Sequence, residues 1–542
     1  MSKKTFIAAA AASAAAAAAA MRLNEKRRAY FSDNKKKIWD FSDALVQKIV
    51  GKMADGVSDN GIPFINRYDN SGFMEGSGYF LLAPAKDAFW SAGFAKNSVV
   101  PENINGDCYI GGYLAFPANK MNGIINEQMV RALAVSDNSG RGINVFAVVD
   151  CLGLSNTDIR AVRQRLKKLI SEKNIVSVNI SATHCHSGID TVGLWGDILK
   201  AYRNNKKAVR EGRQGDTISG KNPEFMENLI SVCAETIEQA VNGMEKGRLF
   251  CARIPAESFV RDKRPPYVTD DIISVLKFLP SGGGAPLSAL FMAAHPTCYG
   301  DKQREAVCDF PRYICDALEK SGVQAMFFQG AQAAVATDRG RHVPQGLCHN
   351  DGIRAYGEAV AAHIAAVPDS EYKELAPLLN VALSELFLPS DNKILQLAGK
   401  LKLVNNQLTR IAMTDSPEPE ADERELYFAT EIGFAQFGGV MNFAMVPGEL
   451  MPEIAVGGAF PDWASYNGES WNYPPLCEIL GGDTSVIGLC NDFIGYIVPD
   501  NDFGSMFAPL HYEEAVSAGR RTASNIAAGF IRLKEKTEKA TI

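Results

Sequence analysis

Three consecutive segments in the first third of the chain predict a strand, a helix and a second strand. Residues 143–149 form an apolar run, and residues 175–180 are rich in β-branched side chains, as buried strands are. Between them, residues 158–172 carry apolar side chains at helical spacing. This order predicts a right-handed βαβ unit in an α/β sheet, where ligands collect beyond the carboxyl ends of the strands. We therefore expect a ligand site shortly after residue 180.

Two histidines stand where the second of these strands ends. His184 and His186 lie in the segment SATHCHSG, residues 181–188. Imidazoles at such a sheet edge are candidate metal ligands, but an isolated pair is equally compatible with hydrogen bonding within a turn. On an extended backbone Cys185 points away from both histidines, so we expect it to pack and not to act as a ligand or nucleophile.

The segment SATHCHSG resembles the THTHSG signature of the neutral/alkaline, non-lysosomal ceramidases, zinc amidases that cleave the N-acyl bond of ceramide. Four later segments resemble the same family in the same order, namely FMAAHPT (291–297), VPGE (446–449), GLCNDFIGY (488–496) and HYEEA (511–515). The resemblance implies the family's fold, an α/β catalytic domain of mixed sheets with helices around them. We expect this domain over residues 105–542, without the C-terminal immunoglobulin-like domain of many members.

The resemblance also implies one zinc ion per chain. Zinc in a hydrolytic site takes about three protein ligands and keeps a position for water. The matched segments assign four ligands, His184, His295, Glu449 and Tyr496. Outside the resemblance, His295 reads equally well as a structural histidine, Glu449 as a first-turn residue of a helix and Tyr496 as a packed side chain.

Three further residues are implied as catalytic groups. His186 would contact the metal-bound water, and Tyr512 would face the scissile group. Arg264 matches the arginine of the family's NR-x-P segment, but Lys263 replaces the asparagine, so Arg261 and a solvated basic turn remain alternatives. Zinc hydroxide would attack the amide carbonyl, after which the oxyanion needs donors and the leaving amine needs a proton.

Two departures from the family pattern bear on the reaction and the substrate. The family's active-site serine falls on Ala333, so we expect a zinc-activated water and no covalent intermediate. The turn after the histidine pair is Ile189-Asp190-Thr191 in place of PGG, which alters the pocket. The leading function is therefore hydrolysis of ceramide or a related lipid-like amide. An esterase or phosphoesterase with the same metal, or an exported binding protein with a vestigial site, remain alternatives.

The N-terminal segment, residues 1–21, combines two lysines with an alanine tract, and basic residues follow it. This pattern predicts export or secretion by a signal segment, with a membrane anchor and a plain alanine helix as alternatives. Residues 22–104 are expected to form an extension that leads into the catalytic domain. A net charge of -6 without a basic, aromatic-rich stripe disfavours nucleic acid as a partner. Contact with a membrane surface and the oligomeric state are left open.

Later in the chain, the pattern predicts a helix over residues 392–411 and a solvated acidic loop over residues 415–425. A C-terminal helix is expected within residues 513–536, where alanine-rich apolar positions favour packing on the domain over membrane binding.

Overall fold

The computed structural model describes residues 32–57, 61–113, 115, 117–213, 219–412 and 424–542. The alanine-rich segment 1–21 and nearly all of the acidic loop 415–425 lie outside these ranges. None of the helices within them is long and apolar enough to cross a bilayer.

The larger of two main sheets contains both parallel and antiparallel strands. Its path runs β11-β9-β8-β6-β1-β3-β4-β5, and β13 adds to β6. The pairs β4–β5 and β9–β11 are parallel, and the other pairs along the path are antiparallel. The strands are β1 (Trp90–Ser98), β3 (Met129–Ser136), β4 (Ile143–Val149), β5 (Ile175–Ala182), β6 (Glu245–Pro255), β8 (Ile272–Pro280), β9 (Leu287–Met292), β11 (Gln324–Gln329) and β13 (Lys373–Glu374).

The second sheet follows the path β14-β16-β17-β19, with β15 paired to β16. Its strands are β14 (Leu379–Pro389), β15 (Leu408–Ala412), β16 (Arg424–Phe437), β17 (Met441–Met445) and β19 (Asp483–Ile487). Short pairs join loops elsewhere, namely β2 (Gly123–Ile124) with β10 (Glu305–Ala306), β7 (Val260–Asp262) with β12 (Val335–Thr337), and β18 (Glu449–Leu450) with β20 (Tyr496–Ile497).

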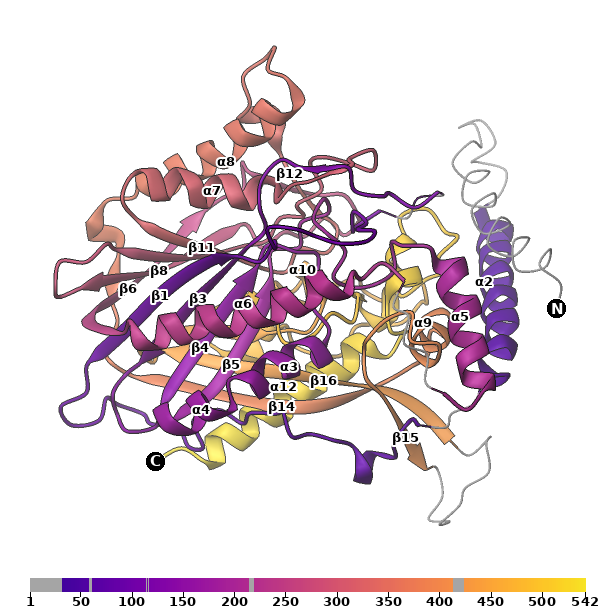
Figure 1. Ribbon diagram of the computed structural model, residues 1–542, viewed down its shortest axis with the longest axis horizontal. Helices are drawn as coiled ribbons and strands as arrows, with labels where there is room; N and C mark the ends of the chain where they lie inside the picture. The colour runs from indigo at the N-terminus through magenta and orange to yellow at the C-terminus, as the bar shows by residue number, and fades with distance from the viewer. Residues whose placement is uncertain (1–31, 58–60, 114, 116, 214–218, 413–423) are drawn as a thin grey trace.

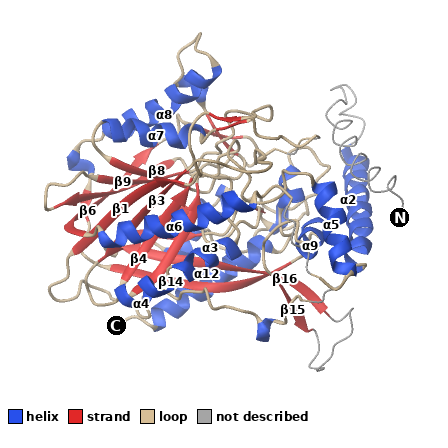
Figure 2. Cartoon of the chain, viewed as in Figure 1, coloured by secondary structure: helices blue, strands red, loops and turns tan. Residues whose placement is uncertain are grey.

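The two sheets pack face to face, and helices cover their outer faces (Figures 1 and 2). Buried aromatic side chains such as Trp90, Phe146 and Phe443 fill the space between the sheets. The flanking helices are α3 (Asn156–Arg165), α4 (Lys167–Lys173), α6 (Pro223–Asn242), α7 (Asp309–Lys320), α8 (His349–Ala365), α10 (Pro452–Val456), α11 (Leu476–Leu480) and α12 (Thr522–Lys539). This arrangement confirms the predicted α/β fold of mixed sheets surrounded by helices.

The predicted strand–helix–strand unit is present as β4, α3 with α4, and β5. The two strands are parallel neighbours, with Val149 beside Ala182 at their carboxyl ends. Ser155 and Asp158 form a capping box that starts α3, which satisfies backbone donors of its first turn. The unit brings the end of β5 to the sheet edge where the histidines follow.

The predicted helix over residues 392–411 is wrong in its second half. Only α9 (Lys393–Lys400) is helical, and the chain leaves the helix with Lys402 in a left-handed conformation. Residues 408–412 pair instead with β16 as strand β15. The helical spacing of apolar residues does not reveal a partner strand that follows later in the chain.

Two more helices lie on one side of the molecule, next to α9. They are α2 (Ser32–Asp55) and α5 (Ile198–Arg210) (Figure 1). Buried residues of all three helices, including Ala54, Ala201 and Leu397, form a separate small core.

Candidate metal centre

The candidate site lies in loops that follow the strands β5 and β9 of the larger sheet. His184 comes two residues after β5, and its positive φ of 65° is uncommon for a residue with a side chain. The backbone N–H of Cys185 donates to the carbonyl of Cys151, which helps to hold this turn. The chain is therefore not extended here as we expected, but turned, and both imidazoles face the same point.

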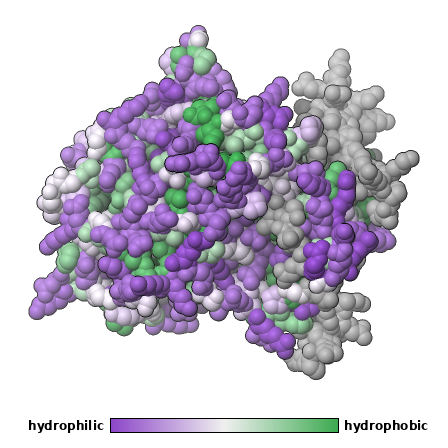
Figure 3. Space-filling view, in the orientation of Figure 1, coloured by the Kyte–Doolittle hydropathy of each residue, from purple (hydrophilic) through white to green (hydrophobic). Residues whose placement is uncertain are grey.

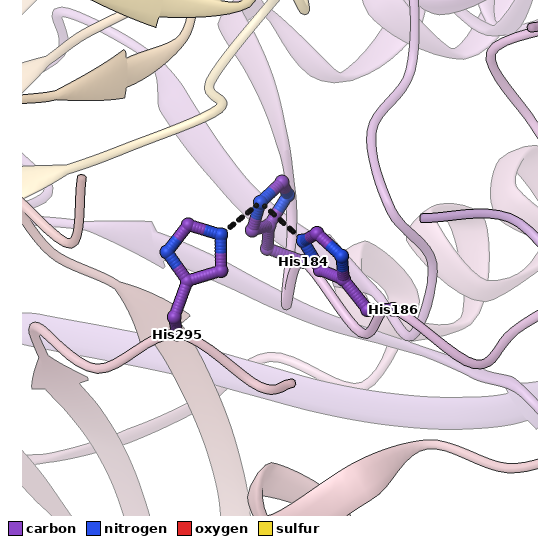
Figure 4. A group of neighbouring side chains, drawn as sticks. All are labelled: His184, His186 and His295. Carbon is purple, nitrogen blue, oxygen red and sulfur yellow. Dashed lines mark hydrogen bonds between the residues drawn. The ribbon is translucent and has the colours of Figure 1, made fainter. Parts of the chain in front are cut away.

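Three imidazoles converge at this point (Figure 4). The Nε2 atom of His184 lies 3.0 Å from Nε2 of His295 and 3.0 Å from Nε2 of His186. His295 follows β9 and is held by its backbone N–H, which donates to the carbonyl of Val335. All three side chains are buried.

A buried carboxylate completes the cluster. Oε2 of Glu449 lies 3.0 Å from Nε2 of His184 and 3.3 Å from Nε2 of His295. The Glu449 side chain is 3% exposed, so an ionised carboxylate there needs a positive charge or a proton donor beside it. Its Oε2 atom faces the Nε2 atoms of two histidines.

The position of the proton on the His184 and His295 rings shows whether a cation fits between them and Glu449. Nδ1 of His184 lies 2.7 Å from the carbonyl oxygen of Leu152, and Nδ1 of His295 lies 3.2 Å from that of Gln332. A carbonyl oxygen only accepts, so each Nδ1 carries the proton and each Nε2 presents a lone pair. Two lone pairs and a carboxylate thus meet with no donor between them.

The distances suit one divalent metal ion. Two atoms bound to the same zinc at about 2.0–2.2 Å are themselves about 3.3 to 3.6 Å apart at the tetrahedral angle. The separations among His184, His295 and Glu449, 3.0 to 3.3 Å, lie at and slightly below the lower end of this range, close enough for all three to bind one ion. Burial lowers the pKa of His295 and of His186, which keeps both imidazoles neutral and able to bind a metal.

Tyr496 lies beside this cluster. Strand β20 pairs in parallel with β18, so that Tyr496 stands next to Glu449. The Tyr496 ring lies almost parallel to that of His295, with centroids 6.3 Å apart. Burial raises the pKa of Tyr496 well above its usual value, so without a cation its hydroxyl stays protonated.

Tyr512 connects the cluster to the surface. Its ring meets that of Tyr496 edge to face with centroids 5.9 Å apart, and about half of its side chain is exposed. It lies in a short 3₁₀ turn, Tyr512–Val516.

Arg264 lies in a buried cluster of acidic side chains. Its guanidinium binds Asp502 at 3.0 Å, Glu513 at 3.1 Å and Glu514 at 2.9 Å, and the side chain is 4% exposed. The alternative residue, Arg261, is exposed on β7. Arg264 thus fixes the turn that carries Tyr512, and its charge is balanced by carboxylates.

Two residues at the site escaped the sequence interpretation. Gly112 has φ of 114°, and a Cβ there would lie 2.7 Å from the Cα of His186. The next residue, Tyr113, places its ring 5.2 Å from that of His186 and donates its hydroxyl to the carbonyl of Thr297. The pair Gly111-Gly112 before an aromatic residue was the available signal, because adjacent glycines often mark a close backbone approach.

The position of the family's serine holds Ala333, which has no nucleophilic group. Ala333 is buried, and its N–H donates to the carbonyl of Leu450. Cys185 is buried, and burial raises the pKa of its thiol well above the usual value. A thiol in this state is a poor nucleophile, in line with the packing role expected for Cys185.

Comparison with known proteins identifies the fold. A neutral ceramidase from Pseudomonas aeruginosa superimposes with a TM-score of 0.60 at 15% identity, over 84% of this chain and 76% of the other. A ceramidase solved in complex with C2 gives a TM-score of 0.58 at 15% identity with the same coverage. No family profile and no curated protein sequence matches the chain. The chain therefore has a neutral ceramidase-like fold, as its segments predicted.

Proposed function

We propose that this protein is a zinc-dependent amidohydrolase that cleaves the N-acyl bond of ceramide or a related lipid-like amide. The observation that carries the proposal is the convergence of two imidazole lone pairs and a carboxylate oxygen, 3.0 to 3.3 Å apart, in a ceramidase-like fold. These three atoms all offer electron pairs, and no hydrogen lies between them to form a hydrogen bond. Such a set of ligand atoms is suited to a Lewis-acidic cation.

His184, His295 and Glu449 would hold the metal, and Tyr496 would be the fourth ligand. A bound zinc ion supplies a Lewis acid and lowers the pKa of its water towards about 7. The carbonyls of Leu152 and Gln332 fix the ring orientation of His184 and His295, a support that metal sites commonly require.

The other groups would act on the substrate. Nδ1 of His186 lacks a hydrogen-bond partner among the described residues, and its ring stands against that of His184. A neutral imidazole in this place is able to take a proton from water and to give one to the leaving amine. Tyr512 would donate its hydroxyl to the oxyanion, and Arg264 would position Tyr512 through Glu513.

Ala333 supports direct attack by water, because no hydroxyl stands at the family's serine position. We therefore expect no acyl-enzyme during turnover, and mass spectrometry of the protein with substrate checks this. An acylated Cys185, or an acylated Thr337, the hydroxyl residue four positions after Ala333, would refute the direct attack. We further propose export of the protein, on the basis of the signal-like residues 1–21.

The test measures metal content and hydrolysis in the same preparations. The protein should contain close to one zinc per chain and hydrolyse N-acyl amines or N-acyl sphingoid bases in preference to matched esters and phosphoesters. His184→Ala should lose both the metal and the activity, whereas His363→Ala, at a half-buried histidine on α8 outside the cluster, should retain both. Activity confined to phosphoesters would refute the amidase assignment.

His186→Ala separates a catalytic role from a ligand role. We expect the variant to retain its metal and to lose activity. Loss of the metal would instead make His186 a ligand, which its distance of 3.0 Å from His184 allows.

A further inference from the structure

Helix α2 carries hydrophobic side chains on its solvent side. Ile38, Phe41 and Leu45 are 55%, 70% and 46% exposed and, at spacings of three and four residues, lie on one face. The opposite side of the helix packs on α9 and the small core around Ala54. Figure 3 shows hydrophobic side chains among hydrophilic ones at the position of α2. The exposed apolar side chains are thus not needed to hold the helix in place.

Lysines accompany these apolar residues on the same exposed face. Lys37, Lys48 and Lys52 are exposed and continue the helical spacing of Phe41 and Leu45. The segment that precedes the helix in the sequence is also basic, although the whole chain has a net charge of -6. An apolar stripe bordered by lysines is typical of helices that lie in the interface of an anionic bilayer.

The helix is tied directly to the loops beside the candidate site. Asp40 accepts a hydrogen bond of 2.6 Å from the hydroxyl of Tyr466, whose ring lies 4.8 Å from that of His511. The residue after His511 is Tyr512, which borders the metal cluster. The loop of Tyr466 also carries Trp463, which is 85% exposed and has the amphipathic ring that favours bilayer interfaces.

We propose that the exposed face of α2, formed by Ile38, Phe41, Leu45, Lys37, Lys48 and Lys52, docks on the surface of an anionic lipid bilayer. Docking there would bring the loops around Tyr466 and Tyr512 close to the bilayer, where an extended lipid substrate would enter. This last step rests on the proposed function, but binding of the helix to lipid does not.

The experiment measures binding of the full-length protein to vesicles that contain no amide substrate, by co-sedimentation. The wild type should bind vesicles of phosphatidylcholine with phosphatidylglycerol more tightly than vesicles of phosphatidylcholine alone, and added salt should weaken the binding. Phe41→Ser, and more so the triple variant I38S/F41S/L45S, should reduce the partition coefficient, the triple by about tenfold or more. Leu82→Ser, which alters a still more exposed apolar residue outside α2, should have no effect.

Replacing Lys37, Lys48 and Lys52 by glutamine should lower the preference for anionic vesicles by about fivefold for each lysine. Thermal unfolding and hydrolysis of a water-soluble short-chain amide report whether each variant is folded. Equal binding of the triple variant and the wild type would overturn the proposal, as would a dimer in solution that Phe41→Ser dissociates. Because the vesicles hold no substrate, an inactive protein that still binds them would refute the proposed function and leave the docking face standing.

Discussion

Replacing Arg264 by methionine tests whether this arginine is structural or faces the substrate. The guanidinium is 4% exposed and contacts three carboxylates at 2.9 to 3.1 Å. Methionine fills a similar volume but leaves Asp502, Glu513 and Glu514 buried near one another without the guanidinium, with His511 beside Glu514 at 2.7 Å. Breaking a buried ion pair by removing one partner costs about 3 to 5 kcal/mol.

That cost translates into a measurable change in melting temperature. The unfolding entropy is about 2 cal/mol/K per residue, or about 1 kcal/mol/K for roughly 500 residues. The variant should therefore melt about 3 to 5 °C below the wild type in differential scanning calorimetry. Arg261→Met, at an exposed position, should change the stability by less than about 0.5 kcal/mol.

The deficit should depend on pH with a defined sign. Burial already raises the pKa of Glu513 to about 7, and loss of the nearby guanidinium raises it further. A carboxyl group whose pKa is raised on folding stabilises the protein below its unfolded pKa, and this stability is lost as pH rises through the folded pKa. The deficit of Arg264→Met should thus be small near pH 5 and largest above pH 7.

Arg264→Lys provides the second control, because it keeps the positive charge but loses the planar guanidinium with its paired N–H donors. Its melting temperature should lie between those of Arg264→Met and the wild type. If Arg264→Met kept its melting temperature while kcat fell, Arg264 would act on the substrate, and the positioning role would be refuted.

Three other predictions concern the metal, a buried acid and a glycine. A chelator should lower the melting temperature of the wild type by about 4 °C, if metal is present at about a thousand times its Kd, whereas Glu449→Gln should respond much less. Burial raises the pKa of Glu453 to about 7, so stability should fall as pH rises from 5 to 8, and Glu453→Gln should reduce that fall in urea unfolding. Gly112→Ala should destabilise the protein by about 2 kcal/mol or more and reduce activity, because its Cβ meets the backbone of His186. Gly140→Ala, which also has a positive φ but open space around it, isolates the backbone cost, and an equal effect of both variants would contradict the steric argument.

Local patterns in the sequence were sufficient for the unit that carries the first histidines. The apolar run 143–149 specifies β4, the helical spacing of residues 158–172 specifies α3, and the β-branched residues 175–180 specify β5. Each pattern acts through interactions between near neighbours in the chain. The resemblance then selected His295, Glu449 and Tyr496 from distant segments, and the structure brings them to one place. Spacing alone could not have grouped these residues, because the packing of the two sheets against each other sets their proximity.

Tertiary structure decided the features that depend on contacts between distant segments. Residues 408–412 form a strand and not a helix because β16 offers them backbone partners. Arg264 is buried because Asp502, Glu513 and Glu514 surround it, although its own sequence reads as a basic turn. Gly112 matters because His186 approaches it from another loop. Charge balance, backbone pairing and close packing across the chain leave no local trace in the sequence, so only the folded arrangement reveals them.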